Sequence, residues 1–122
     1  MKRRKPPESR AGKIRTVTIA GLEVKLETGE YEDGSLCEFR IIVGKEGGAL
    51  RELDVGARGF SLALQYGAPV ELIVEHMVHH ETELGGVVKG CQIKLCKSIW
   101  DWVGRRLKKD YINGRVSDNT DV

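Results

Sequence analysis

The chain has 122 residues and a mass of 13.6 kDa, enough for one compact domain with its own core but not for two. Hydrophobic residues make up 40% and charged residues 31%, and no apolar run could cross a bilayer, which excludes a membrane protein. The N-terminus lacks the apolar stretch of a secretory signal, and three cysteines do not make a disulfide framework. We therefore expect a single-domain cytoplasmic protein with free thiols.

The first half of the chain predicts strands. Residues 1–13 are basic and almost without apolar residues, so they predict a disordered arm. Apolar and polar residues then alternate in "TVTI", in "LEVKLE" and in residues 37–43, with turns at Ala20-Gly21 and at "EDGS". This pattern predicts a three-stranded antiparallel meander.

The second half predicts helices. Apolar residues from Leu50 to Leu64 recur at spacings of three and four, and Gly67 ends that helix. "PVELIVEHMVHH" predicts a short second helix, and residues 92–108 a third. We therefore expect an α+β domain over residues 14–112, with the meander packed against two or three helices, and a disordered tail over 113–122.

More apolar residues are present than one small sheet can cover. They lie on the far side of the first helix and on one flank of the last: Val55, Leu62, Tyr66, Trp100 and Trp102. Exposed apolar patches of this kind are uncommon on monomers, and aromatic residues are enriched in interfaces. We therefore predict a homodimer or a higher closed oligomer that buries these residues.

The turn after residue 43 favours one of two roles. Lys45, Gly47 and Gly48 lie between a strand and a helix, where backbone N–H groups can hold an anion such as a nucleotide phosphate. A P-loop would place the lysine after the glycines, followed by Ser or Thr, and this stretch does not. The alternative is a plain turn in which glycine supplies the backbone freedom.

Cysteines and histidines raise a zinc hypothesis. Cys91, Cys96 and His79 are the candidate ligands, but residues five apart on a continuous helix point about 140° apart. The alternative reading is a buried thiol and a histidine at a helix end. Neither serine nor histidine occurs in a nucleophile motif, so we expect no enzyme activity from residue chemistry alone and no cofactor, with zinc as the alternative.

Basic residues gather at both ends of the chain, although the net charge is only +2. Solvated termini would explain this distribution, but a basic patch could also attract phosphate backbones. A nucleic-acid-binding module would use the arm and the basic face of the last helix: Arg3, Arg4, Lys94, Lys97, Arg105 and Lys108.

Three stretches resemble a known family: "YEDGSLCEFRIIVGKEGGALREL", "SLALQYGAPVELIVEHM" and "CKSIWDWVGRRL". They are similar to the C-terminal domain of adenosylcobalamin-dependent ribonucleotide reductases, a module of the TSCPD type. The resemblance covers residues 14–108 and is most specific at residues 62–67 and 97–99. The Thr-Ser-Cys-Pro-Asp stretch of the family is replaced here by a sequence that keeps Cys91 but lacks its proline and aspartate.

The resemblance implies a context in deoxynucleotide metabolism and DNA replication. The large barrel that holds the radical cysteine, substrate and cobalamin in the reductases is missing, so reductase activity does not transfer. We expect a stand-alone, non-catalytic accessory or ligand-binding module, which binds a ribonucleotide reductase catalytic chain or a nucleotide. The alternative is the nucleic-acid-binding module.

Overall fold

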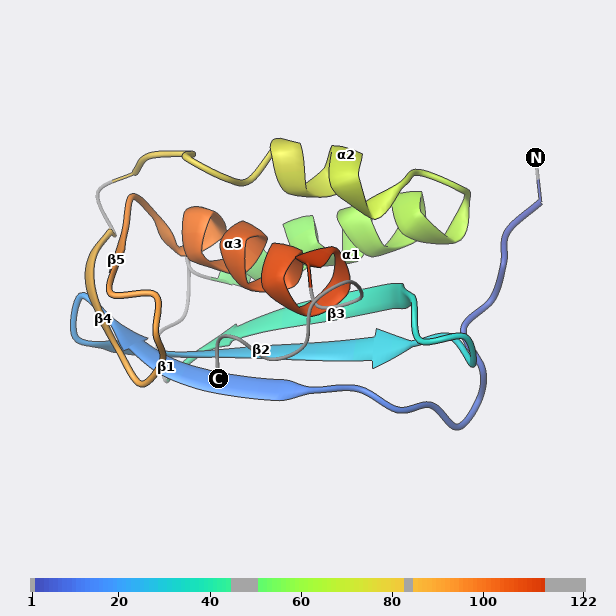
Figure 1. Ribbon diagram of the computed structural model, residues 1–122, viewed down its shortest axis with the longest axis horizontal. Coiled ribbons are helices and arrows are strands. Elements are labelled where there is room, and N and C mark those ends of the chain that lie inside the picture. Colours follow the sequence, from blue (N-terminus) through green and yellow to red (C-terminus); the bar gives the residue numbers. More distant parts are fainter. Residues whose placement is uncertain (1, 45–50, 83–84, 114–122) are drawn as a thin grey trace. The chain divides into compact units, whose positions relative to one another are not determined.

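The computed structural model describes residues 2–44, 51–82 and 85–113 (Figure 1). The strands are β1 (Ile14–Ile19), β2 (Leu22–Glu30), β3 (Leu36–Val43), β4 (Gly86–Lys89) and β5 (Leu95–Cys96). The helices are α1 (Glu52–Gln65), α2 (Val70–Glu75) and α3 (Ile99–Tyr111). The strand order is β3-β2-β1-β4-β5. The α+β class is therefore confirmed, but the three-stranded meander is wrong because β4 and β5 extend the sheet.

The chain divides into two compact units. The first consists of Met1–Thr16 and Val24–Pro69, and the second of Val17–Glu23 and Val70–Val122. No helix in the described ranges is long and apolar enough to cross a bilayer.

In the first unit, β2 and β3 form the antiparallel hairpin that their alternating sequences predict. Their register runs from Val24 opposite Val43 to Glu30 opposite Leu36. The turn between them has Gly34 at φ 88° and an Asp33 carboxylate that accepts bonds from the Ser35 N–H and hydroxyl. One face of the hairpin is buried, and its members are Val24, Leu26, Cys37, Phe39, Ile41 and Val43.

Helix α1 packs along β3 (Figure 1). Ala57 and Leu64 of the predicted stripe are buried, while Leu53 and Phe60 are half-buried. The Phe60 ring stacks on Phe39 with 6.4 Å between centroids. Gly67, at φ 107°, follows the helix end and donates its N–H to the Leu64 carbonyl, as predicted for a terminating glycine. The predicted helical residue Leu50 lies outside the described residues.

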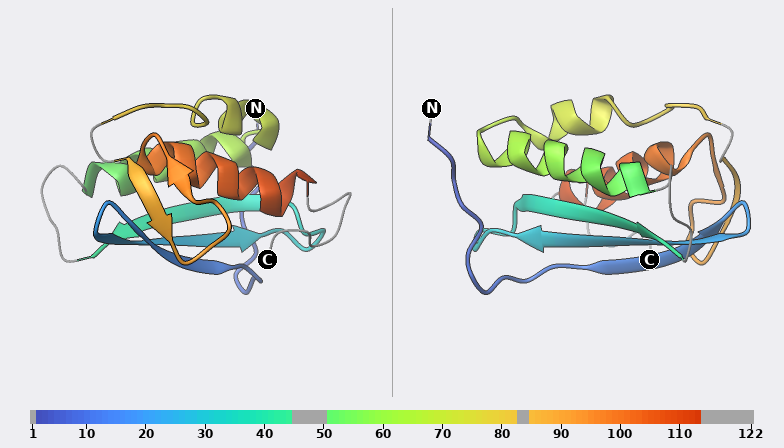
Figure 2. Two further views of the ribbon diagram at one scale, coloured as in Figure 1. Left: turned by 60° about the vertical axis from the view of Figure 1, so that its left-hand side comes forward. Right: turned by 180° about the vertical axis from the view of Figure 1, so that it is seen from behind.

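The N-terminal arm is an extended segment that leads into β1 (Figure 2, right). Its backbone bonds to the rest of the unit, with Arg4 N–H to the Gln65 carbonyl at 2.8 Å and Glu30 N–H to the Ala11 carbonyl at 2.9 Å. The Arg4 guanidinium lies 3.7 Å from the centre of the Tyr31 ring, and the Tyr31 hydroxyl donates to the Arg4 carbonyl. These contacts involve residues for which the composition predicts a disordered arm, and that disorder stays a prediction.

In the second unit, β4 pairs with both β1 and β5 in antiparallel fashion. Thr18 lies opposite Lys89, and Gly86 opposite Cys96. The predicted turn at Ala20-Gly21 is present with φ of 52° and 82°. In the left view of Figure 2, the β4–β5 ribbon leads into α3.

Helix α3 begins at Ile99, so the prediction that a helix starts at Gln92 is wrong. Residues 92–98 instead contain β5, and Ser98 is extended at φ −168°. Trp102 and Leu107 are fully buried, and α3 packs against α2. Gly104 fits closely there, because an added Cβ would lie 2.7 Å from the Met77 Cβ.

Candidate functional site

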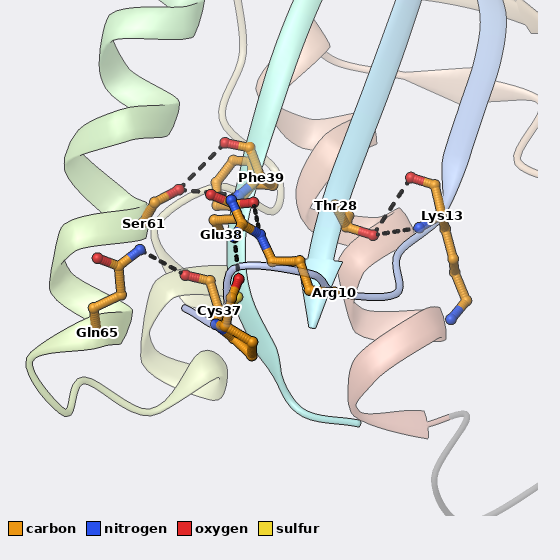
Figure 3. Close-up of polar contacts among 9 residues, drawn as sticks. Arg10, Lys13, Thr28, Cys37, Glu38, Phe39, Ser61 and Gln65 are labelled. Atoms are coloured by element: carbon orange, nitrogen blue, oxygen red, sulfur yellow. Dashed lines mark hydrogen bonds and ion pairs between the residues drawn. The ribbon is translucent and has the colours of Figure 1, made fainter. Parts of the chain in front are cut away.

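The inner face of α1 carries polar side chains that bond to the outer edge of β3 (Figure 3). The Ser61 hydroxyl accepts from the Phe39 N–H at 3.0 Å and lies 3.2 Å from the Phe39 carbonyl. The Asp54 carboxylate accepts from the Ile41 N–H at 3.2 Å. These side chains occupy backbone groups that an edge strand would otherwise leave open to pairing with another chain.

Gln65 joins three segments of the first unit. Its side-chain amide donates to the Cys37 carbonyl at 3.0 Å, and its side-chain oxygen accepts from the Arg3 guanidinium at 2.8 Å. Its backbone carbonyl accepts from the Arg4 N–H. Gln65 is only 5% exposed. Both polar atoms of this buried amide are thus satisfied within the chain, so Gln65 holds the arm, β3 and α1 together.

Asp54 connects the same helix to two arginines. Arg40 lies 3.2 Å and Arg58 3.4 Å from one carboxylate oxygen. Burial acts to raise the pKa of Asp54, but hydrogen bonds from Arg40 and the Ile41 N–H outweigh it and hold that pKa below its ordinary value. Asp54 is therefore ionised at neutral pH and shared between two guanidinium groups.

A cleft of about 420 Å³ opens beside these residues. Its walls come from the arm, from β3 and from α1, and the lining residues are Arg3, Glu38, Phe39, Arg40, Arg58, Ser61, Leu62 and Gln65. Glu38 is already paired with Arg10 at 2.6 Å. Sequence reasoning missed Arg40 and Arg58 as site residues, although the spacing of Asp54 and Arg58 by four on a helix signals an ion pair.

The outer face of α1 is apolar next to this cleft. Val55 is 56%, Leu62 48% and Tyr66 44% exposed, as their predicted place on the far side of the helix requires. At 100° per residue, these residues and Arg58 fall within an arc of about 80°. Leu62 belongs to both the cleft and this stripe. We call the cleft together with Val55, Leu62 and Tyr66 the α1 surface.

In the second unit, the Lys97-Ser98-Ile99 motif starts α3. The Ser98 hydroxyl accepts from the Asp101 N–H at 2.9 Å and donates to the His80 carbonyl. The Asp101 carboxylate accepts from the Lys97 N–H at 2.8 Å and from the His79 N–H at 2.6 Å. Ser98 is thus the N-cap residue of α3, and Asp101 in the first turn accepts from two N–H groups that precede the helix.

Asp101 is 1% exposed, so its charge depends on these bonds. Burial acts to raise the pKa of Asp101, but the N–H groups of Lys97 and His79 outweigh it and lower that pKa. The motif is thus an anchor for the helix start.

The predicted anion-binding residues Lys45, Gly47 and Gly48 lie outside the described residues. The predicted zinc ligands are inside them: Cys96 is buried, Cys91 half-buried and His79 exposed. Within the described part of the chain, no group of three or more His, Cys, Asp or Glu residues is placed to hold a metal ion.

Trp102 was predicted to contact a partner, but it is 0% exposed and belongs to the core. Trp100 is half-buried. The sequence misassigned this flank because a wide apolar arc on a helix does not reveal how many of its sides the same chain covers.

The residues of the nucleic-acid hypothesis do not form one helical face. Arg3 and Arg4 bond to Gln65 and Tyr31, and Arg105 donates to the Leu95 carbonyl at 2.6 Å. Lys94 and Lys97 precede α3 instead of lying on it. Lys94, Lys97 and Lys108 are exposed.

The strand order and the buried motif residues define a small α+β domain. The chain belongs to the TSCPD domain family, whose model matches residues 1–111. It is 40% identical, over 91% of its length, to a vitamin B12-dependent ribonucleotide reductase of Bradyrhizobium diazoefficiens, and covers 9% of that protein.

Other relatives carry the same name. Identity is 40% over 90% of the chain for the protein of Agrobacterium fabrum and 32% over 93% for that of Rhodopirellula baltica, with 9% and 11% of those proteins covered. The chain thus spans about a tenth of the length of these relatives. No solved structure matches it significantly.

Proposed function

We propose that the protein is a non-catalytic accessory module of ribonucleotide reduction that acts by binding a reductase catalytic chain. The observation that carries this proposal is how the polar motif residues are used. Ser61, Gln65, Ser98 and Asp101 are buried and bonded to backbone groups of their own unit. The α1 surface, in contrast, is exposed and combines apolar and cationic side chains, which suits binding.

The relatives supply the context. Their names attach this module to vitamin B12-dependent ribonucleotide reductases, in which it makes up about a tenth of the length. A module related to a part of such an enzyme can fit the surface on which that part normally packs. The reductase of the relatives is therefore the first partner to test.

The test uses the Bradyrhizobium diazoefficiens reductase with and without the segment that this chain matches. We expect the full chain to bind the shortened enzyme in calorimetry, and to bind the intact enzyme more weakly because the resident segment competes. Ribonucleotide reduction by the shortened enzyme is measured with and without the added chain. Equal, undetectable binding to both forms would contradict the proposal.

Two ligand hypotheses stay predictions. Nucleotide binding at Lys45, Gly47 and Gly48 is measured by equilibrium dialysis with ATP and dATP, with Lys45→Ala as the variant that should weaken it. Steeply salt-dependent binding to duplex DNA, lost when Lys94, Lys97 and Lys108 are replaced by Gln, would instead favour the nucleic-acid-binding module.

A further inference from the structure

The cleft on the first unit has an excess of positive charge. Its three arginines come from the arm, from β3 and from α1, and among the described residues Glu38 is the only acidic one that lines it. When the ion-pair partners Arg10 and Asp54 are added, four guanidinium groups stand against two carboxylates.

The bonds within the chain leave N–H donors of these arginines available to a ligand. The Arg40 and Arg58 side chains are 55% and 69% exposed and share one oxygen of a single carboxylate. Among the described residues, the Arg3 guanidinium donates only through its Nε, to the Gln65 side chain. A guanidinium group has five N–H donors in a planar fork, which suits two-point binding of a carboxylate.

The apolar part of the α1 surface lies directly beside this charge. Leu62 lines the cleft, and Val55 and Tyr66 continue from it along the same helix face. The ligand must therefore match cations and an apolar stripe together. A free phosphate would leave the stripe uncovered, whereas a protein segment with acidic and apolar side chains covers both.

We propose that the α1 surface binds an acidic segment of another protein in which carboxylates alternate with apolar side chains. Carboxylates of the segment pair with Arg3, Arg40 and Arg58, and its apolar residues cover Leu62 and the stripe. Arginine and tyrosine are enriched at the centres of such interfaces. This inference rests on the proposed function, because it names the chemistry of the reductase segment that the module binds.

Charge complementarity favours an acidic partner over a second copy of this chain. A second copy presents the same excess of arginines, and juxtaposed like charges weaken association. The β3 edge offers no alternative at Phe39 and Ile41, because Ser61 and Asp54 already occupy the N–H groups of those residues.

The probe is a fluorescein-labelled peptide made of repeated Glu-Glu-Leu-Leu units, titrated with the full chain by fluorescence anisotropy. Two matched peptides replace all Glu by Gln or all Leu by Ser. We expect the Glu-Glu-Leu-Leu peptide to bind, and each replacement to weaken binding at least tenfold. Added salt should also weaken binding of the Glu-Glu-Leu-Leu peptide.

Arg58→Gln removes one positive charge from the cleft. Leu62→Glu places a negative charge at the centre of the apolar stripe, where it repels the acidic segment. Each should weaken peptide binding roughly tenfold or more. The matched controls Lys94→Gln and Leu72→Glu change an exposed lysine and an exposed leucine of the second unit and should leave binding unchanged. Thermal melting of each variant checks that the fold is intact.

The outcomes separate this inference from the proposed function. Peptide binding that Arg58→Gln and Leu62→Glu weaken supports the α1 surface even if no reductase binds. Reductase binding that neither variant weakens overturns the α1 surface while the proposed function stands. Equal binding of the Gln peptide, or a dimer in sedimentation that Leu62→Glu dissociates without any peptide binding, also overturns the inference.

Discussion

Helices α1 and α3 have similar lengths, 14 and 13 residues, but differ in how much of each is buried. Four residues of α1 are buried, on the side that faces β3, whereas eight residues of α3 are buried. Both helices also bury polar side chains that bond to backbone groups. Helix α3 is therefore mostly buried in the core, while α1 packs against β3 on one side and is exposed on the other.

Stability should fall most when a core residue of α3 is truncated, and far less when a surface residue of α1 is. Trp102→Ala in α3 should lower the free energy of unfolding by about 3–5 kcal/mol, because it opens a cavity at a fully buried position. Leu62→Ala in α1 should change it by less than about 1 kcal/mol. Urea denaturation monitored by far-ultraviolet circular dichroism measures both free energies of unfolding. Similar losses for the two variants would contradict the difference in burial between the helices.

The second effect tests the bonds of the Asp101 carboxylate at the start of α3. Asp101→Asn should lower the free energy of unfolding by about 2 kcal/mol at neutral pH, because one buried N–H loses a charged acceptor. Since the pKa of folded Asp101 lies below 3.8, its stabilisation is complete above that value and is lost as the pH falls through the folded pKa.

The difference in free energy of unfolding between the wild type and Asp101→Asn should therefore become smaller below about pH 4. Glu75→Gln, at an exposed position of α2, is the control and should leave stability unchanged near pH 7. If this difference in free energy of unfolding stays constant down to pH 2, the carboxylate charge does not stabilise the helix start.

Removal of the arm tests the anchor of α1. Deleting residues 1–10 eliminates the Arg3 and Arg4 bonds to Gln65 and the Arg10 pair with Glu38. We expect a loss of about 2 kcal/mol and a fall in melting temperature of several degrees. A melting temperature unchanged by the deletion would agree with the disordered arm that the composition predicts.

The same substitution, glycine to alanine, tests the packing of both helices. Gly59→Ala in α1 should stabilise the protein by up to about 1 kcal/mol, since the added methyl group meets open space. Gly104→Ala in α3 should destabilise it by about 1 kcal/mol or more, because the methyl group collides with Met77. Opposite signs in thermal melting are expected, and equal signs would contradict the difference in packing.

The smallest effect concerns thiol reactivity and leaves stability unchanged. Burial raises the pKa of both the Cys37 and the Cys96 thiol, which lowers their thiolate fractions. Half-buried Cys91 should react first with a chromogenic disulfide reagent, and the other two slowly. In urea all three should react at similar rates. Fast reaction of Cys96 in the native protein would place it outside the core.

Much of the fold follows from local patterns. The alternation in β2 and β3, the turns with positive φ at Gly21 and Gly34, and the exposed stripe of α1 are confirmed. Burial of Cys96 was also predicted correctly, but from a helix that the structure replaces with β5. In β5 the Cys96 side chain lies on the buried side of the strand, whereas the neighbouring Leu95 is 62% exposed.

The start of α3 could not be predicted from its own residues. Residues 92–98 have a helix-like apolar pattern, yet they contain β5 and their carbonyls accept bonds from residues outside the predicted helix. Val88 N–H donates to the Lys94 carbonyl at 2.8 Å and Thr82 N–H to the Lys97 carbonyl at 3.0 Å. Such bonds override local propensity when the summed tertiary gain exceeds a few tenths of a kcal/mol per residue.

The α+β class, the hairpin of the first unit and the family follow from the sequence alone, because alternation, turn glycines and motif order are local properties of the chain. The burial of Trp102 and the charge of the cleft depend on tertiary packing. Arg3, Arg40 and Arg58 are far apart in sequence and line one cleft only after the arm, β3 and α1 pack together. Their charges then act within a few ångströms of one another, and no linear pattern encodes that proximity.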